Sequence, residues 1–179
     1  MTSTKKSQQA ERLLNRLARA ERAITSTAFV VLVVVVFGDV ASRELTGTGL
    51  HWARQAGVYA NLFVVMFGLG VASAGGAHLR PRFADGWLPA RFGPVLDRLQ
   101  DAGMALFCVV FAGIAVAVVA ESFELAERSV VLRVVIWPFQ AVIPIAFTLA
   151  GLRHLAYAMF PELRPPLASA VAGDEEGGT

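Results

Sequence analysis

The sequence alternates between long apolar stretches without charge and shorter segments that hold the charged residues. The charge-free stretches cover residues 23–38, 56–77, 102–120 and 134–152. The longest has 22 residues. At about 1.5 Å per residue, a helix of that length is about 33 Å long and matches the hydrocarbon core of a bilayer. The pattern therefore predicts four membrane-spanning helices, at about 23–42, 56–77, 102–121 and 134–158.

Two segments outside these spans have the spacing of amphipathic helices. In the basic segment 1–22, apolar residues recur at helical intervals at Leu13, Leu14 and Leu17. Between the second and third spans, one helical face would hold Phe92, Val95, Leu96 and Leu99. Helices of this kind lie in the membrane interface, so we expect one before the first span and one between the second and third.

These elements predict an all-α integral membrane protein. Its parts are a basic amphipathic segment (1–22), a four-helix transmembrane domain (23–160) and a polar, disordered tail (161–179). The composition agrees, because 55% hydrophobic residues and a mean hydropathy of +0.56 are too apolar for a soluble domain of 179 residues.

The placement of the basic residues predicts the orientation. The N-terminal segment, the second connection and the C-terminal segment together hold twelve arginines and lysines, whereas the first and third connections hold four. Basic residues favour the cytoplasmic side, so both termini are predicted to be cytoplasmic. For the same reason we interpret the basic N-terminal segment as a topology signal, and expect a lipid bilayer as its partner rather than nucleic acid.

Small residues at helical spacing mark surfaces that allow close helix packing. They are Gly68, Ala72 and Gly76 in the second span and Gly113 and Ala117 in the third. Two alternatives stay open for these faces: packing within the chain, or contact with a partner subunit.

Three polar features fall within or beside the spans. Asp39 lies one helical turn before Arg43, which favours an interfacial ion pair, with a proton-relay role as the alternative. Asn61 is expected to form a hydrogen bond between helices. Pro144 lacks an amide hydrogen and crowds the carbonyl of Gln140, so the fourth span is expected to kink there.

No catalytic, cofactor-binding or metal-ligating motif is apparent in the sequence, and no enzymatic activity is expected. Cys108, the one cysteine, lies in an apolar stretch and is interpreted as a small buried hydrophobic residue. Of the three histidines, His78 and His154 fall at the same membrane face and His51 at the other. A transmembrane haem needs two axial histidines that face each other, so only the first pair could hold one. This is the less favoured alternative.

The arrangement resembles the small integral-membrane subunit of tripartite ATP-independent periplasmic (TRAP) transporters over most of residues 10–160. The motif positions that carry the resemblance are Gly49, Leu50 and Trp52, then Gly76, Ala77, His78 and Arg80, and finally Trp137 and Pro144. The chain departs from the family pattern at Arg54, Gln55, Pro81, Arg82, Phe83 and Ala146.

The resemblance implies a non-catalytic, multi-pass subunit of the bacterial inner membrane. Its partners would be a large multi-span subunit and a periplasmic substrate-binding protein. Such systems import organic acids, dicarboxylates among them, with an ion gradient that is usually sodium. The residues themselves also favour a scaffold, because the spans hold almost no ionisable groups. The rival hypotheses are a self-assembling four-helix membrane protein with a channel or signalling role, and a haem-binding electron-transfer subunit.

Overall fold

The computed structural model describes residues 2–74 and 93–164. In these two ranges the chain is helical, without a β-strand, and one isolated bridge pairs Arg128 with Val135. The elements are α1 (Thr2–Thr46), α2 (Ala53–Ala74), α3 (Gly93–Glu124), α4 (Trp137–Gln140), α5 (Val142–Met159) and a short 3-10 helix (Pro161–Leu163).

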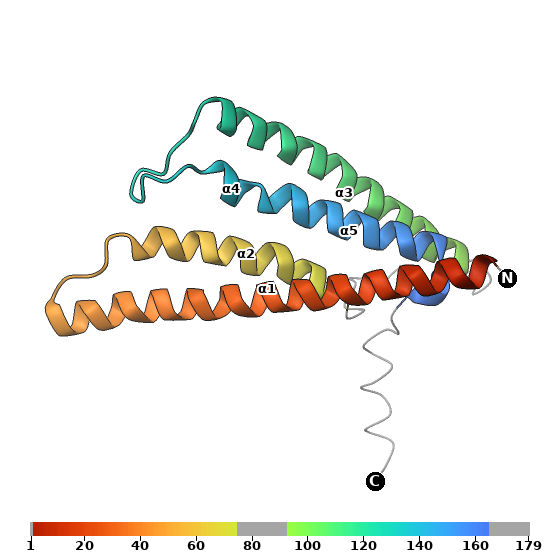
Figure 1. The fold of residues 1–179 in the computed structure, drawn as a ribbon, viewed down its shortest axis with the longest axis horizontal. Helices are drawn as coiled ribbons and strands as arrows, with labels where there is room; N and C mark the ends of the chain where they lie inside the picture. The colour runs from red at the N-terminus through yellow and green to blue at the C-terminus, as the bar shows by residue number, and fades with distance from the viewer. Residues whose placement is uncertain (1, 75–92, 165–179) are drawn as a thin grey trace, which may run out of the picture.

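The helices form two antiparallel hairpins. The first pairs α1 with α2, and the second pairs α3 with α5, with the short α4 preceding α5 (Figure 1). The hairpins meet near the start of α1 and the end of α5 and diverge toward the loops 47–52 and 125–136 (Figure 1). We call the meeting end the closed end and the loop end the open end.

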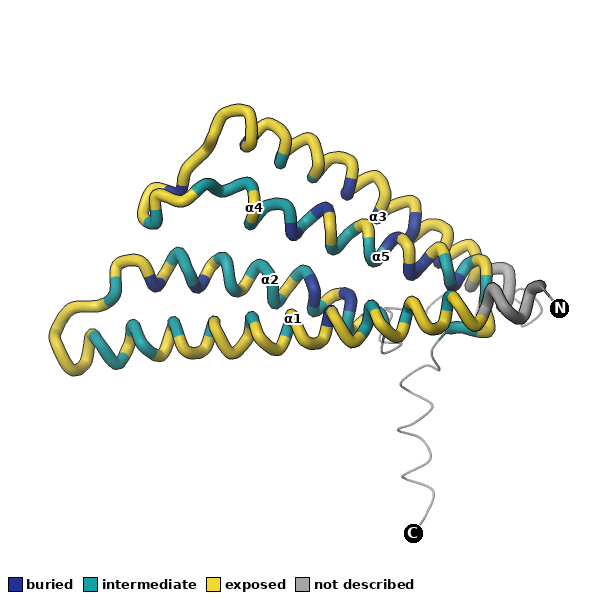
Figure 2. The backbone as a smooth tube through the Cα atoms, viewed as in Figure 1, coloured by how far each residue is buried: buried dark blue, intermediate teal, exposed yellow. Residues whose placement is uncertain are grey.

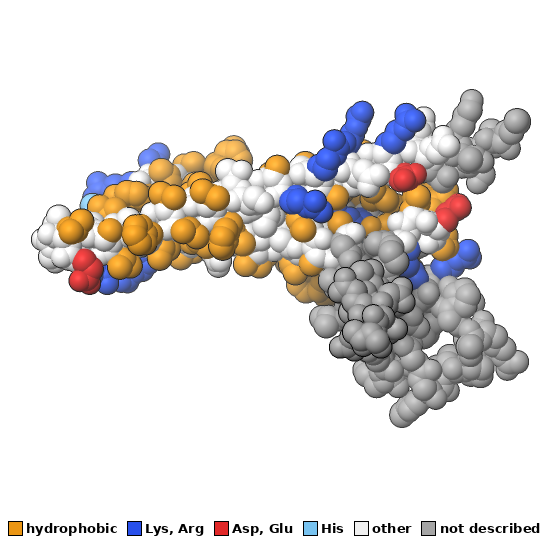
Figure 3. Space-filling view, turned by 90° about the horizontal axis from the view of Figure 1, so that it is seen from below, with side chains coloured by type: hydrophobic (Ala, Val, Ile, Leu, Met, Phe, Trp, Pro, Cys, Tyr) orange, Lys and Arg blue, Asp and Glu red, His pale blue; other side chains and the backbone are white. Residues whose placement is uncertain are grey.

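Four helical segments are long and apolar enough to cross a membrane: Gln8–Thr46, Ala53–Ala74, Arg98–Glu124 and Trp137–Met159. Buried positions gather where the hairpins meet and along their facing sides, while most of the outer surface is exposed (Figure 2). The exposed middle of the molecule is largely hydrophobic, and the visible charged side chains lie toward its two ends (Figure 3). The four predicted spans are therefore confirmed as membrane-length apolar helices.

The first helix differs from its expected form. We expected a surface helix that turns into the first span, whereas α1 runs unbroken over 45 residues. Its N-terminal half holds no glycine or proline and is rich in alanine, leucine, arginine and glutamate, which are strong helix formers. Whether this half lies in the membrane interface stays a prediction.

The segment between the second and third spans is described only in part. Residues 75–92 lie outside the described ranges, and α3 already begins at Gly93. The later part of the expected interfacial helix is thus continuous with the third span.

The fourth span is interrupted at Ala141, between α4 and α5. Pro144 lies in the first turn of α5 and has no amide hydrogen to donate to the carbonyl of Gln140. The Ile145 amide bonds to the carbonyl of Ala141 at 3.3 Å, and the helix resumes from there. Ala141 keeps helical dihedral angles (φ −59°, ψ −19°), and the kink expected at Pro144 stays a prediction.

Candidate functional site

A buried ion pair joins the two hairpins near the closed end. Arg153, near the end of α5, has a side chain that is 1% exposed, and it pairs with Glu21 of α1, which is 3% exposed. One guanidinium nitrogen donates to the Glu21 carboxylate, and another donates to the backbone carbonyl of Gly70 in α2. A buried arginine needs such neutralisation and hydrogen bonding, because an isolated charge away from water is very costly. One side chain thus connects three helices.

A second buried group of polar side chains lies beside this pair and involves α3. The Nδ1 atom of His154 lies 3.1 Å from Oδ1 of Asp101, whose other carboxylate oxygen accepts a hydrogen bond from Arg164. On its other side, Nε2 of His154 is 3.4 Å from the Ser73 hydroxyl. Together with the Arg153 pair, these contacts connect α1, α2, α3 and α5 near the closed end.

Glycines allow the close approach that this arrangement needs. A Cβ added to Gly70 would lie 2.4 Å from Oε1 of Glu21, far inside contact distance. Within the second hairpin, a Cβ on Gly151 would lie 3.2 Å from Cβ of Cys108. The backbone of α2 can therefore meet the Glu21 carboxylate only because residue 70 has no side chain.

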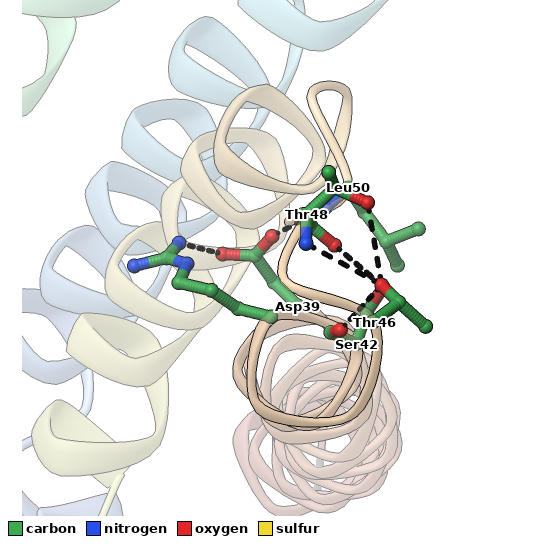
Figure 4. A network of polar contacts seen from close by, with 6 residues as sticks. Asp39, Ser42, Thr46, Thr48 and Leu50 are labelled. Carbon is green, nitrogen blue, oxygen red and sulfur yellow. Dashed lines mark hydrogen bonds and ion pairs between the residues drawn. The ribbon is translucent and has the colours of Figure 1, made fainter.

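At the open end, Asp39 organises the loop that joins α1 to α2 (Figure 4). Its Oδ1 atom accepts a hydrogen bond from the Leu50 amide at 2.7 Å, and its Oδ2 atom accepts one from Arg43 at 2.7 Å. Around it, the Thr46 hydroxyl donates to the carbonyl of Ser42 at 2.7 Å. The expected Asp39–Arg43 ion pair is confirmed, and the same carboxylate also holds the loop backbone.

Two contacts connect the hairpins again at the open end. The Val131 amide, in the loop that follows α3, donates to the side-chain carbonyl of Gln55 in α2 at 3.2 Å. The rings of Tyr59 and Phe139 stack with their centroids 4.1 Å apart. The hairpins are therefore linked at both ends.

The family model of the DctQ component of tripartite ATP-independent periplasmic transporters matches residues 32–164, well over half of the chain. The chain belongs to this family. It is a subunit of a membrane transporter and not an enzyme. Transporters of this family also include a large membrane subunit and a periplasmic binding protein. No curated protein and no solved structure matches the chain.

Four of the described positions on which the resemblance to TRAP small subunits rested lie at the open end. Gly49 and Leu50 form the loop around Asp39, and Trp52 follows them directly before α2. Trp137 begins α4, with its ring edge-on to that of Phe123 at 5.5 Å between centroids. A Cβ on Gly49 would lie 2.7 Å from Oδ1 of Asp39, which explains why this loop position suits glycine.

The remaining motif positions, Gly76, Ala77, His78 and Arg80, lie outside the described residues. The haem alternative needed His78 together with His154. The described part of this pair, His154, is 3% exposed and has its two ring nitrogens beside Asp101 and Ser73. Within residues 2–74 and 93–164, no group of three histidine, cysteine or acidic side chains is placed to hold a metal ion.

Within residues 2–74 and 93–164, the described small residues of the two faces take little part in packing. Gly68 is partly exposed, and an added Cβ would touch only the methyl of Thr25 at 3.9 Å. Ala72, Gly113 and Ala117 are exposed, and a Cβ on Gly113 would meet nothing within 4 Å. A partner interface at these positions stays a prediction.

Sequence reasoning missed the buried charged residues near the closed end. Glu21 fell within the basic segment that was expected in the membrane interface, and Arg153 entered only the count of basic residues. One signal was present in the chain: acidic Glu21 and Asp101 and basic Arg153 each lie next to a charge-free stretch, at the end that faces the same predicted side of the membrane. Opposite charges at the same side of the membrane can neutralise each other once the helices associate.

Proposed function

We propose that this chain is the small permease subunit that scaffolds the large membrane subunit of a TRAP-type transporter. The transporter would use an ion gradient, sodium in the usual case, to import an organic acid such as a dicarboxylate. A periplasmic binding protein would deliver the substrate across the bacterial inner membrane. Both termini would face the cytoplasm, which places the open end in the periplasm.

The arrangement of charge supports a scaffold rather than a transport path. The buried charged side chains near the closed end, Glu21, Asp101 and Arg153, are engaged with one another or with neighbouring groups of the same bundle. A path for an ion or an organic anion would need polar groups free to bind it near the middle of the membrane. The buried charges of the described residues instead connect helices.

One exposed face of α2 favours contact with a helix of a partner subunit. Val58, Asn61, Val65, Leu69 and Ala72 are all exposed, and their spacing places them within a sector of about 80° on a helix with 3.6 residues per turn. We call this stripe the α2 outer face. In the two described ranges, the Asn61 side chain has no hydrogen-bond partner, so the expected bond between helices stays a prediction.

The exposed amide of Asn61 carries the proposal. An amide that faces lipid tails is unfavourable, because hydrocarbon offers it neither donors nor acceptors. A polar side chain of an adjoining subunit would satisfy it, and such interhelical bonds contribute about 0.6–2 kcal/mol. The α2 outer face is therefore proposed as the surface that meets the large subunit, together with the small residue Ala72.

Co-purification with the large subunit tests the scaffold role. Asn61→Leu and Val65→Trp should each lower recovery of the large subunit on this chain, while the variant chains still insert alone. Val118→Trp is the matched control, since Val118 on α3 is 48% exposed and Val65 is 46% exposed. Equal recovery for all three variants would contradict the assignment of this face. Stable self-association of the chain without a large subunit would instead support the self-assembling alternative.

A further inference from the structure

A groove opens between the hairpins in the region that crosses the membrane. It has a volume of about 580 Å³, within the usual range for ligand sites. Its walls come from α1, α2, α4 and the loop before α4, and its lining is almost wholly apolar. Representative lining residues are Thr27, Val31, Ala60, Phe63, Leu132 and Phe139.

A second pocket, of about 510 Å³, lies at the open end and is basic. Arg43, His51 and Arg54 line it, with no acidic side chain among the lining residues. Arg43 forms an ion pair with Asp39, whereas Arg54 has no acidic partner within the described ranges. Tyr59 lines both this basic pocket and the apolar groove, so the two adjoin at this residue.

We propose that the groove and the basic pocket together bind one phospholipid. The headgroup phosphate would lie at Arg54 beside His51, and one acyl chain would pass Tyr59 and fill the groove. The basic pocket is cationic and the adjoining groove is apolar. A phospholipid has the complementary form, with an anionic phosphate attached to long hydrocarbon chains. A free phosphate ion would leave the groove unfilled.

The linked ends of the hairpins favour a flexible chain over a protein helix. The hairpins are joined by Arg153 and Glu21 at one end, and by the Tyr59–Phe139 stack and the Gln55–Val131 hydrogen bond at the other. A helix with side chains is about 10–12 Å across and would have to break these contacts to enter. An acyl chain is thinner and can enter from the side, through the bilayer that surrounds the protein.

Native mass spectrometry of the full chain tests the site. The chain is reconstituted in vesicles of equimolar phosphatidylethanolamine and phosphatidylglycerol and then extracted in mild detergent. We expect one retained phospholipid per chain. Arg54→Gln removes the cation and should lower the retained fraction about tenfold, since a charge-assisted hydrogen bond is lost. Ala60→Phe fills the groove and should lower the retained fraction similarly. If that variant fails to insert, Thr27→Phe fills the groove from the α1 side.

Matched variants separate a site from general lipid adhesion. Arg133→Gln changes an exposed arginine at the open end, and Ala120→Phe enlarges an exposed alanine of α3; neither residue lines the site. Both should retain lipid as the unchanged chain does, and an equal loss in these controls would overturn the proposal. So would unchanged lipid retention in Arg54→Gln combined with weaker recovery of the periplasmic binding protein, because the pocket would then be a protein-docking surface.

The assembled transporter provides a last test. Lipid that is retained by the chain alone and lost once the large subunit binds would assign the groove to the subunit interface and overturn the proposal. Retention in the complex supports it. The lipid site belongs to this chain alone. A negative result for lipid binding would therefore leave the scaffold role untouched, and a negative result for the scaffold role would leave the lipid site untouched.

Discussion

Arg153 and Glu21 are 132 residues apart in the sequence and form an ion pair whose two side chains are almost completely buried. The pair holds the end of the last span against the first, where the two hairpins meet. The Arg153 guanidinium also donates a hydrogen bond to the Gly70 carbonyl and so connects α2 to the same pair. Stability of the four-helix unit should therefore depend on both partners together rather than on either charge alone.

Removing one partner should destabilise the bundle strongly. Arg153→Met leaves the Glu21 carboxylate buried without its cation, and Glu21→Leu leaves the guanidinium uncompensated. Each single change should cost about 3–5 kcal/mol of unfolding free energy, whereas the double variant should recover much of that loss. Denaturant unfolding of the purified chain in detergent measures both. A double variant as unstable as the sum of the singles would show that the two side chains are not coupled.

Gly70 should tolerate a methyl group much less well than Gly68. Gly70→Ala places Cβ at 2.4 Å from Oε1 of Glu21, so the carboxylate has to move away from Arg153. Gly68→Ala meets only a methyl at 3.9 Å and removes a residue of low helix propensity, which should stabilise the helix by up to about 1 kcal/mol. Thermal unfolding of the two variants should shift in opposite directions. Equal shifts would contradict the close approach at Gly70.

The contrast between these glycines shows what the sequence could and could not predict. Charge-free runs of sufficient length revealed all four spans, because bilayer thickness alone sets that requirement. Spacing also predicted the Asp39–Arg43 pair, which is local. Each of these features depends on residues close together in the chain.

Contacts between distant segments were not predictable in this way. The four-residue repeat of small residues drew attention to Gly68 and Ala72, yet the α2 glycine that has no room for a Cβ is Gly70, beside the Glu21 carboxylate. The side of α2 that faces α1 is set by how the hairpins pack, and that packing depends on Glu21 and Arg153 meeting across the bundle. Periodicity within one helix carries no information about such a partner.

The Asp39 carboxylate should protect the Leu50 amide from hydrogen exchange. Asp39→Ala removes the acceptor, worth about 1.5 kcal/mol for a charged oxygen, and should speed exchange at Leu50 roughly tenfold. Asp39→Asn keeps an acceptor oxygen and loses only the charge that pairs with Arg43, so its effect should be smaller. Hydrogen exchange of the loop peptide measures the difference. Equal exchange in both variants would show that the ion pair, rather than the acceptor, orders the loop.

The open end is predicted to face the periplasm. Val130 is 91% exposed in the loop after α3, so Val130→Cys should react with a membrane-impermeant thiol reagent added to intact cells. Asn15→Cys, on the exposed surface of α1 toward the closed end, should react only after the membrane is opened. Both variants are made with Cys108→Ala, which removes the natural thiol. The reverse labelling pattern would invert the topology.

The side chains of this subunit should not set the affinity of the transporter for its substrate or its ion. Gln140 is the strictest test, because its side-chain oxygen is buried beside the break in the fourth span and has no hydrogen-bond partner within the described residues. A buried oxygen without a partner, beside a proline that removes a helical hydrogen bond, is the kind of feature that could bind an ion in a transporter. We expect Gln140→Leu and Asn61→Leu to lower at most the amount of assembled complex, and so the maximal uptake rate. Uptake is measured against substrate and against sodium concentration and normalised to complex abundance. A large shift in either apparent affinity at unchanged abundance would place Gln140 or Asn61 on the transport path, whereas unchanged affinities are what a scaffold requires.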